Sequence, residues 1–217
     1  RIIMTDTKIT MERKCLAQRG CKITALAEPP KIHDSMWKNL YVRIMKNWQA
    51  LNMPEDTISY QIGDIVLVVY SPTEESDREI HFWFTRQIAD SWNLNAKAVY
   101  DYALDNTTKS LKPKYFDYKS PLPYKVVTNT DYYEGAMLIF VPHIVDQIAE
   151  DFNDDLYIAF TSFHEAVCHP VTGIDPKDIQ SVIQCMLLTG KIRIWDFLTD
   201  EVLKYDRDTR KVSVVDM

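Results

Sequence analysis

Apolar residues recur along the chain in two spacings, one typical of helices and one typical of strands. Five segments have apolar residues three or four positions apart, as expected of helices that bury one face. These segments predict helices over residues 34–51, 79–92, 95–107, 142–152 and 175–187. Within the second of them, His81–Phe84 taken alone would also suit a strand.

Alternating or β-branched apolar runs predict the strands. The runs lie at residues 58–62, 65–70, 124–128, 136–141, 155–160, 163–167, 202–205 and 212–215. Gly63–Asp64 marks a bend or bulge between the first two runs, and residues 206–209 join the last two as a hairpin. Helices and strands are interspersed without strict βαβ crossovers. The pattern therefore predicts an α+β fold with a mixed or antiparallel sheet and several packed helices, in a single main domain.

A pair of prolines near the N-terminus divides the chain into a short and a long part. Glu28–Pro29–Pro30 follows a basic N-terminal stretch, which we interpret as a head or linker over residues 1–30. Residues 31–217 then form the globular domain. With 217 residues, 46% of them hydrophobic, the chain can bury a core without disulfides or a structural metal.

Charge is distributed unevenly between the two ends of the chain. Residues 1–50 carry a net charge of +6, and residues 51–217 carry −12. Nucleic-acid affinity depends on clustered Lys and Arg that neutralise phosphates. An acidic body therefore argues against nucleic acid as the main partner, and only residues 1–50 are suited to contact it.

Several functional classes are disfavoured by what the sequence lacks. Five glycines include no GxGxxG or GxxxxGK[ST] motif, so no nucleotide cofactor is expected. The longest apolar run, Ala136–Val141, is too short to span a bilayer, and the N-terminus lacks a signal-peptide core. Four cysteines without a CxxC pair indicate reduced thiols. We expect a cytoplasmic protein with no membrane partner.

The segment HEAVCH at residues 164–169 contains side chains that often bind metals. His164 and His169 diverge by about 140° on a helix, and they face opposite sides of a strand. His164 and Cys168 would converge on a helix, but on a strand they lie about 13 Å apart. Since the flanking apolar residues favour a strand, the expectation is no metal site, with His164 and Cys168 as the candidate pair if the segment is helical.

Ser162, His164 and Glu165 are the candidate catalytic residues, and two interpretations of them stay open. In the structural one, His164 and Glu165 hydrogen-bond the Thr161–Ser162 turn or each other. In the catalytic one, Ser162 is a nucleophile and His164 its base. The sequence has no G-x-S-x-G elbow, and residues two apart rarely reach attack geometry.

A polar and aromatic loop separates two of the predicted strands. Asn129, Asp131, Tyr132 and Tyr133 are its candidate binding residues. Such a loop can bind a ligand, or it can be a hairpin connection in which Asn and Asp supply turn hydrogen bonds.

From about Thr57 onward, the chain resembles a bacterial family known as domain of unknown function 5688. The resemblance rests on the words ISYQIGDIVLVVY, WNLNAKAVYDYALDNT, VVTNTDYYEGAMLIFV, DLYIAFTSFHEAV and LTDEVLKYD. The family's Ser-Ser-x-His-Glu word stands here as Thr161–Glu165, with Phe160 and Thr161 where the family has Pro and Ser. The resemblance implies a bacterial protein of gut anaerobes and their mobile elements, and it implies no activity.

Two hypotheses follow for the function. The first is a non-catalytic domain that binds a protein partner and serves a mobile element or phage against a host system. Its acidic body and basic head would steer docking by charge. The second is a hydrolase or small-ligand enzyme centred on His164 and Glu165, with Ser162, Asn129 and Asp131 contributing from adjacent turns.

Overall fold

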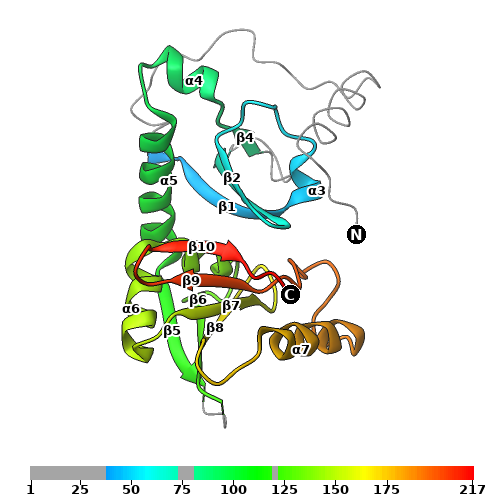
Figure 1. Ribbon diagram of the computed structural model, residues 1–217. Coiled ribbons are helices and arrows are strands. Elements are labelled where there is room, and N and C mark those ends of the chain that lie inside the picture. Colours follow the sequence, from blue (N-terminus) through cyan, green and yellow to red (C-terminus); the bar gives the residue numbers. More distant parts are fainter. Residues whose placement is uncertain (1–37, 73–80, 119–121) are drawn as a thin grey trace.

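Two antiparallel sheets lie one above the other in the computed structural model, which describes residues 38–72, 81–118 and 122–217 (Figure 1). The predicted α+β class is confirmed, and every pairing between the strands that the structure describes is antiparallel. The predicted head at residues 1–30 lies outside the described residues, so the domain boundary remains a prediction. No helix among the described residues is long and apolar enough to cross a membrane.

The four-stranded sheet is built around one long strand. β3 (Ile65–Pro72) pairs with β1 (Tyr41–Lys46) on one side, and with β2 (Ser59–Ile62) and β4 (His81–Trp83) on the other. Alternate residues of β3 enter two different apolar clusters, which explains its uninterrupted apolar run. The strands predicted at residues 58–62 and 65–70 are confirmed. Gly63, at φ +54°, forms the tight turn between them.

The helix predicted over residues 34–51 is wrong where the structure describes it. Residues Tyr41–Lys46 form strand β1, and the helix α3 that follows covers no more than Asn47–Ala50. Leu40, Val42 and Ile44 alternate inward, and the pairing of β1 with β3 outweighs the four-residue spacing of Leu40, Ile44 and Trp48.

The second predicted helix is replaced by a strand and a shorter helix. After β4, Thr85 caps α4 (Arg86–Ser91), and its Oγ1 accepts a hydrogen bond from the Ile88 N–H at 3.3 Å. The next predicted helix is confirmed as α5 (Ala96–Leu111), with Asn95 as its N-cap. Residues 79 and 80 lie outside the described part of the chain.

The six-stranded sheet has the order β10-β9-β7-β8-β6-β5. The strands are β5 (Pro113–Tyr118), β6 (Tyr124–Asn129), β7 (Leu156–Phe160), β8 (Ala166–Pro170), β9 (Leu203–Asp206) and β10 (Lys211–Val214). The strands predicted at residues 124–128 and 155–160 and the C-terminal hairpin are confirmed. The strand predicted at residues 163–167 begins later, because Phe163, His164 and Glu165 belong to the turn before β8. β5 was not predicted, and Pro113 is tolerated as the first residue of this edge strand.

One helix packs on each face of the six-stranded sheet. α6 (Pro142–Phe152) shares a cluster with Ile158, whereas α7 (Pro176–Leu188) shares one with Ala159. Successive side chains of a strand point to opposite faces, so these neighbours on β7 separate the two helices. Both helices were predicted, and Asp175 caps α7 as expected.

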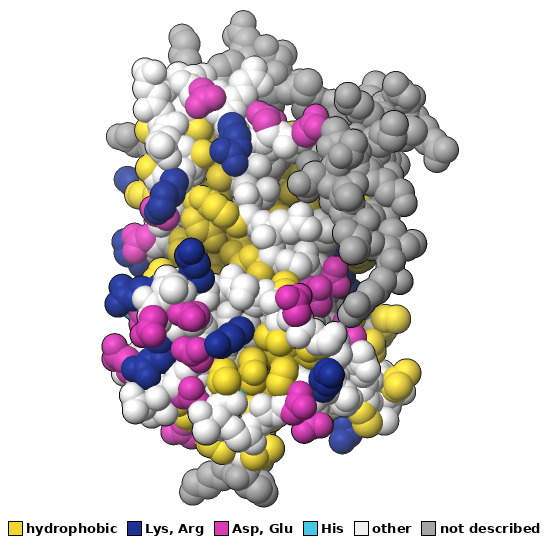
Figure 2. Space-filling model, in the orientation of Figure 1, with side chains coloured by type: hydrophobic (Ala, Val, Ile, Leu, Met, Phe, Trp, Pro, Cys, Tyr) yellow, Lys and Arg dark blue, Asp and Glu magenta, His cyan; other side chains and the backbone are white. Residues whose placement is uncertain are grey.

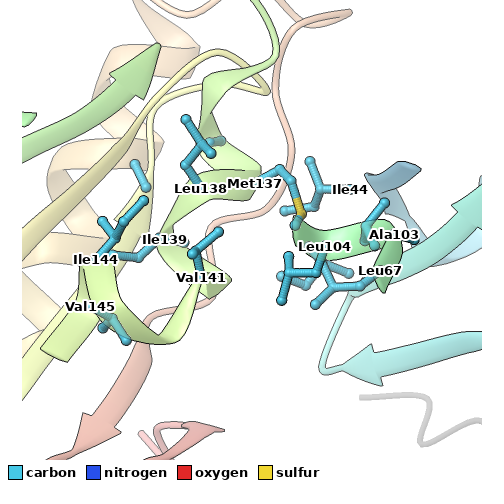
Figure 3. Packing of buried hydrophobic residues seen from close by; sticks show 14 of the residues in the cluster. Ile44, Leu67, Ala103, Leu104, Met137, Leu138, Ile139, Val141, Ile144 and Val145 are labelled. Atoms are coloured by element: carbon cyan, nitrogen blue, oxygen red, sulfur yellow. The ribbon is translucent and has the colours of Figure 1, made fainter. Parts of the chain in front are cut away.

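A short 3₁₀ helix links the two sheets. η1 (Gly135–Phe140) forms where a strand was predicted at residues 136–141, so that prediction is wrong. Burial of Gly135–Ile139 explains the apolar run, and no described strand pairs with these residues. Figure 3 shows Met137 reaching from η1 toward Ile44 of β1. The largest buried cluster therefore runs continuously from one sheet to the other.

Candidate functional site

The predicted site residues come from two turns that lie next to each other. Thr128, near the end of β6, donates from its Oγ1 to the His164 carbonyl oxygen at 2.8 Å. The Ala136 N–H donates to the Phe163 carbonyl oxygen at 3.1 Å. These bonds join the turn at residues 130–134 to the turn at residues 161–165. The structure thereby brings the candidate catalytic and binding residues to one end of the six-stranded sheet.

One nitrogen of the His164 ring accepts a hydrogen bond, and the other lies near a carboxylate. Its Nδ1 accepts a hydrogen bond from the Glu134 N–H at 3.1 Å, and its Nε2 lies 3.7 Å from Asp196 Oδ1. The Tyr133 ring lies 5.2 Å away, centroid to centroid. A neutral imidazole has one acceptor nitrogen, so the proton resides on Nε2 and faces the carboxylate. The lone pair that a general base would use is already taken by the backbone.

Ser162 and Glu165 hold their own turn. Ser162 Oγ accepts a hydrogen bond from the backbone N–H of His164 at 3.0 Å. Thr161 Oγ1 donates to Glu165 Oε1 at 2.7 Å. No hydrogen bond found among the described residues joins the Ser162 hydroxyl to the His164 ring. The bond between Thr161 and Glu165 is of the kind that the structural interpretation expects for Glu165, whereas the His164 ring contacts Glu134 and Asp196 and not the Thr161–Ser162 turn.

Buried Asn129 holds the backbone of the turn at residues 130–134. Its Oδ1 accepts from the Tyr133 N–H at 3.0 Å, and its Nδ2 donates to the Tyr133 carbonyl oxygen at 2.5 Å. Tyr132 and Glu134 both have left-handed backbones, at φ +55° and +54°. Such conformations each cost about 1 kcal/mol or more for residues other than glycine and persist only where the surroundings fix them. The turn is therefore held in one shape.

The same turn presents two tyrosines at the surface. Tyr132 and Tyr133 are 53% and 56% exposed, and Asp131 is exposed beside them. The Lys114 ammonium lies 4.5 Å from the centroid of the Tyr132 ring and donates to its hydroxyl oxygen. The phenol ring is thus held in place from the neighbouring strand β5.

A pocket of about 280 Å³ lies beside this turn and is lined by residues of the four-stranded sheet, α5 and η1. Its walls include Ile44, Met137 and Phe163, together with the ion pair formed by Arg43 and Glu134. Arg43 Nη2 lies 2.7 Å from Glu134 Oε1, and both side chains are partly buried. Glu134 therefore contacts the pocket through its side chain and His164 through its backbone.

The candidate metal pair does not converge. Cys168 is fully buried in the core beside α6, and burial raises the pKa of its thiol. His164 lies in the turn before β8, where its ring faces Asp196. Within the described ranges, no group of three or more His, Cys, Asp or Glu residues is placed to hold a metal ion.

Sequence reasoning missed three residues that shape this site. Arg43 and Asp196 lie far along the chain from the turn that they support. Glu134 directly follows Tyr133 in the loop, and neither its backbone contact with His164 nor its ion pair with Arg43 was predicted. No local pattern marks Arg43 or Asp196, because their roles arise from strand pairing and from the path of the chain after α7.

Part of the chain, including the site, matches the model of a known protein family. Residues 117–207 match the model described as "Family of unknown function (DUF5688)", which confirms the predicted resemblance over this part of the chain. The matched range contains both turns of the site, and Arg43 lies outside it. No curated protein and no solved structure matches the chain.

Proposed function

We propose that this chain is a non-catalytic domain that binds a protein partner through the turn at residues 130–134. One observation carries the proposal: a turn held in a left-handed backbone by buried Asn129 presents the exposed rings of Tyr132 and Tyr133. Tyrosine is enriched at protein interfaces and in the residues that dominate binding energy. A turn that is already ordered loses little entropy when it binds.

The contacts of the candidate catalytic residues support the same proposal. The Nδ1 lone pair of His164 accepts the Glu134 N–H, and Ser162 Oγ accepts the His164 N–H. A serine hydrolase needs the hydroxyl hydrogen-bonded to its base, with a third group that orients the base. Here His164 and Ser162 instead stabilise the two adjoining turns, one of which carries the tyrosines, so their contacts support a structural role.

The resemblance to a family of unknown function that is expected in gut anaerobes and their mobile elements directs the search for a partner. A host or phage protein is the partner class that we test first. In such a complex the domain would act for the mobile element against the host system.

A photo-crosslinking experiment tests the proposal. The photoreactive residue p-benzoylphenylalanine is placed at Tyr132 and, as the control, at Tyr115, which is exposed on β5. In the lysate of a gut anaerobe we expect a discrete adduct from position 132 and none from position 115. An excess of wild-type protein without the photoreactive residue should reduce the yield of the adduct. An excess of the variant Tyr132→Ser with Tyr133→Ser, also without the photoreactive residue, should not.

Equal adducts from both positions, or competition by the double variant, would overturn the proposal. A hydrolase predicts a different result. Turnover of an ester or peptide substrate that is lost in His164→Ala and retained in the double tyrosine variant would favour the enzyme hypothesis.

A further inference from the structure

An apolar corner projects from the molecule where α7 ends. Leu188, Ile194 and Trp195 are 87%, 70% and 68% exposed, and we call these three residues with Lys191 and Arg193 the α7 corner. Figure 2 shows hydrophobic side chains at the lower right margin, where Figure 1 places the end of α7. Large apolar side chains gathered on a surface mark a site of interaction.

Backbone hydrogen bonds hold the α7 corner in one conformation, so the fold itself keeps its apolar side chains exposed. The N–H groups of Lys191 and Ile192 both donate to the Met186 carbonyl oxygen, at 2.9 and 3.1 Å. Ile192 is buried beneath α7, and it anchors the turn between Leu188 and Ile194. The N–H groups of Asp196 and Phe197 donate to the Arg193 carbonyl oxygen.

The charge of the corner is opposite to that of the chain. The whole chain has a net charge of −6, yet residues 179–195 contain no Asp or Glu and carry only Lys191 and Arg193. The Arg193 guanidinium lies 6.0 Å from the centroid of the Trp195 ring. Cations beside exposed tryptophan and aliphatic side chains favour a surface that is apolar within and anionic at its boundary.

We propose that the α7 corner docks the protein on the anionic surface of a lipid bilayer. Leu188, Ile194 and Trp195 enter the headgroup region, where tryptophan is favoured, while Lys191 and Arg193 contact lipid phosphates. Leu188 is 87% exposed and extends away from the protein surface. A lipid headgroup layer can deform around such a protruding side chain, so the corner fits a bilayer surface. Residues 51–217 carry a net charge of −12, so the body of the chain outside the corner is repelled by the same lipids, whereas the basic residues 1–50 are not.

The α7 corner shares no residue with the turn at residues 130–134, although Asp196 beside Trp195 contacts the neighbouring turn at residues 161–165. The proposal does not depend on the protein partner. The expectation of no membrane partner rested on the lack of a spanning segment. Docking on the bilayer surface requires none.

Vesicle co-sedimentation with the full chain tests the proposal. The vesicles are phosphatidylcholine alone, or phosphatidylcholine with about one-third phosphatidylserine, at low salt. We expect sedimentation with the mixed vesicles and a loss of at least roughly tenfold in affinity for Leu188→Ser with Trp195→Ser, because two apolar side chains no longer enter the interface. The double variant Lys191→Glu with Arg193→Glu loses binding to the mixed vesicles as well.

Matched controls separate the corner from general surface effects. Trp48→Ser removes another exposed tryptophan, 63% exposed on α3, and Lys211→Glu reverses an exposed charge on β10. Both controls are expected to bind like the wild type. Thermal unfolding checks that every variant is folded, as expected for substitutions at exposed positions.

Three results would overturn the proposal. The first is no sedimentation of the wild type with the mixed vesicles, and the second is unchanged binding of the Leu188 and Trp195 double variant. The third is a wild-type dimer, measured by light scattering, that the same double variant dissociates. That result would assign the corner to a second copy of the chain.

Discussion

His164 accepts a hydrogen bond at Nδ1 from the backbone N–H of Glu134, 3.1 Å away, and Glu134 itself has a left-handed backbone. The imidazole therefore satisfies a backbone donor in a conformation that a glutamate rarely adopts. On this geometry the His164 ring is a support for the turn at residues 130–134. Replacing His164 should therefore lower the free energy of unfolding.

We expect His164→Ala to lower the free energy of unfolding by about 1–3 kcal/mol, because the partly buried Glu134 N–H loses its acceptor. His164→Asn keeps an acceptor at a similar distance from the backbone and should recover much of that loss. Urea unfolding of both variants measures the difference. An alanine variant as stable as the wild type would contradict the supporting role of the ring.

The second prediction concerns Asn129, which hydrogen-bonds the backbone of the same turn. Asn129→Ala removes the partners of both the Tyr133 N–H and the Tyr133 carbonyl oxygen. We expect a loss of about 1–3 kcal/mol in the free energy of unfolding, together with faster amide exchange at residues 130–134. Hydrogen exchange followed by mass spectrometry measures the second effect. Unchanged exchange would show that Asn129 does not hold the turn.

Gly135 allows the close approach of η1 to the end of β6. A Cβ at this position would lie 2.6 Å from the Asn129 backbone nitrogen and 2.7 Å from Thr128 Cα. Gly135→Ala is therefore expected to destabilise the fold by at least about 1–3 kcal/mol through overpacking, as thermal unfolding would record.

Gly190→Ala is the matched control for Gly135→Ala. Gly190 has φ +71°, and a Cβ there meets nothing within 4 Å. Its substitution tests backbone strain without a clash, so the loss should be the smaller of the two. Equal losses would mean that the contact with β6 is not what requires glycine at position 135.

Local sequence signals identified the elements that carry their own start and stop signals. Asn95 and Asp175 cap helices that the structure contains, because each side chain accepts a backbone N–H of the first turn. The failure at residues 34–51 has the opposite cause. Leu40 and Ile44 satisfy a helical and a strand spacing at once, and the choice depends on pairing with distant β3.

The candidate site divides in the same way between local and distant information. The turn signals around Asn129 and the His164–Glu165 word are local, and the sequence indicated both. The ion pair of Arg43 with Glu134 joins residues 91 positions apart. Such a contact depends on how the two sheets pack, which no local pattern encodes.

The two described cysteines are expected to differ sharply in reactivity. Cys168 is fully buried and its pKa is raised by burial, whereas Cys185 is exposed on α7. Since the thiolate is the reactive form, iodoacetamide should modify Cys185 in the native protein and leave Cys168 untouched. Mass spectrometry of a Cys15→Ser, Cys21→Ser background distinguishes the two sites. Modification of Cys168 without unfolding would contradict its place in the core.

His169 predicts how stability depends on pH. Burial lowers the pKa of its imidazole from the ordinary value of 6.5, against a weaker opposing effect from a hydrogen bond to the Pro123 carbonyl oxygen. Its Nδ1 is buried without a hydrogen-bond partner among the described residues, and its ring lies 5.3 Å from that of Tyr124. The folded state therefore disfavours the protonated ring.

The unfolded chain binds a proton at His169 at a higher pH than the folded protein does. The stability associated with the neutral ring is fully present above about pH 6.5 and falls as the pH decreases toward the lower pKa of the folded state. His169→Phe keeps an aromatic ring against Tyr124 and removes the titration. Urea unfolding at about pH 7.5 and pH 5 should show a larger loss for the wild type than for the variant. Equal losses would place the imidazole in contact with solvent.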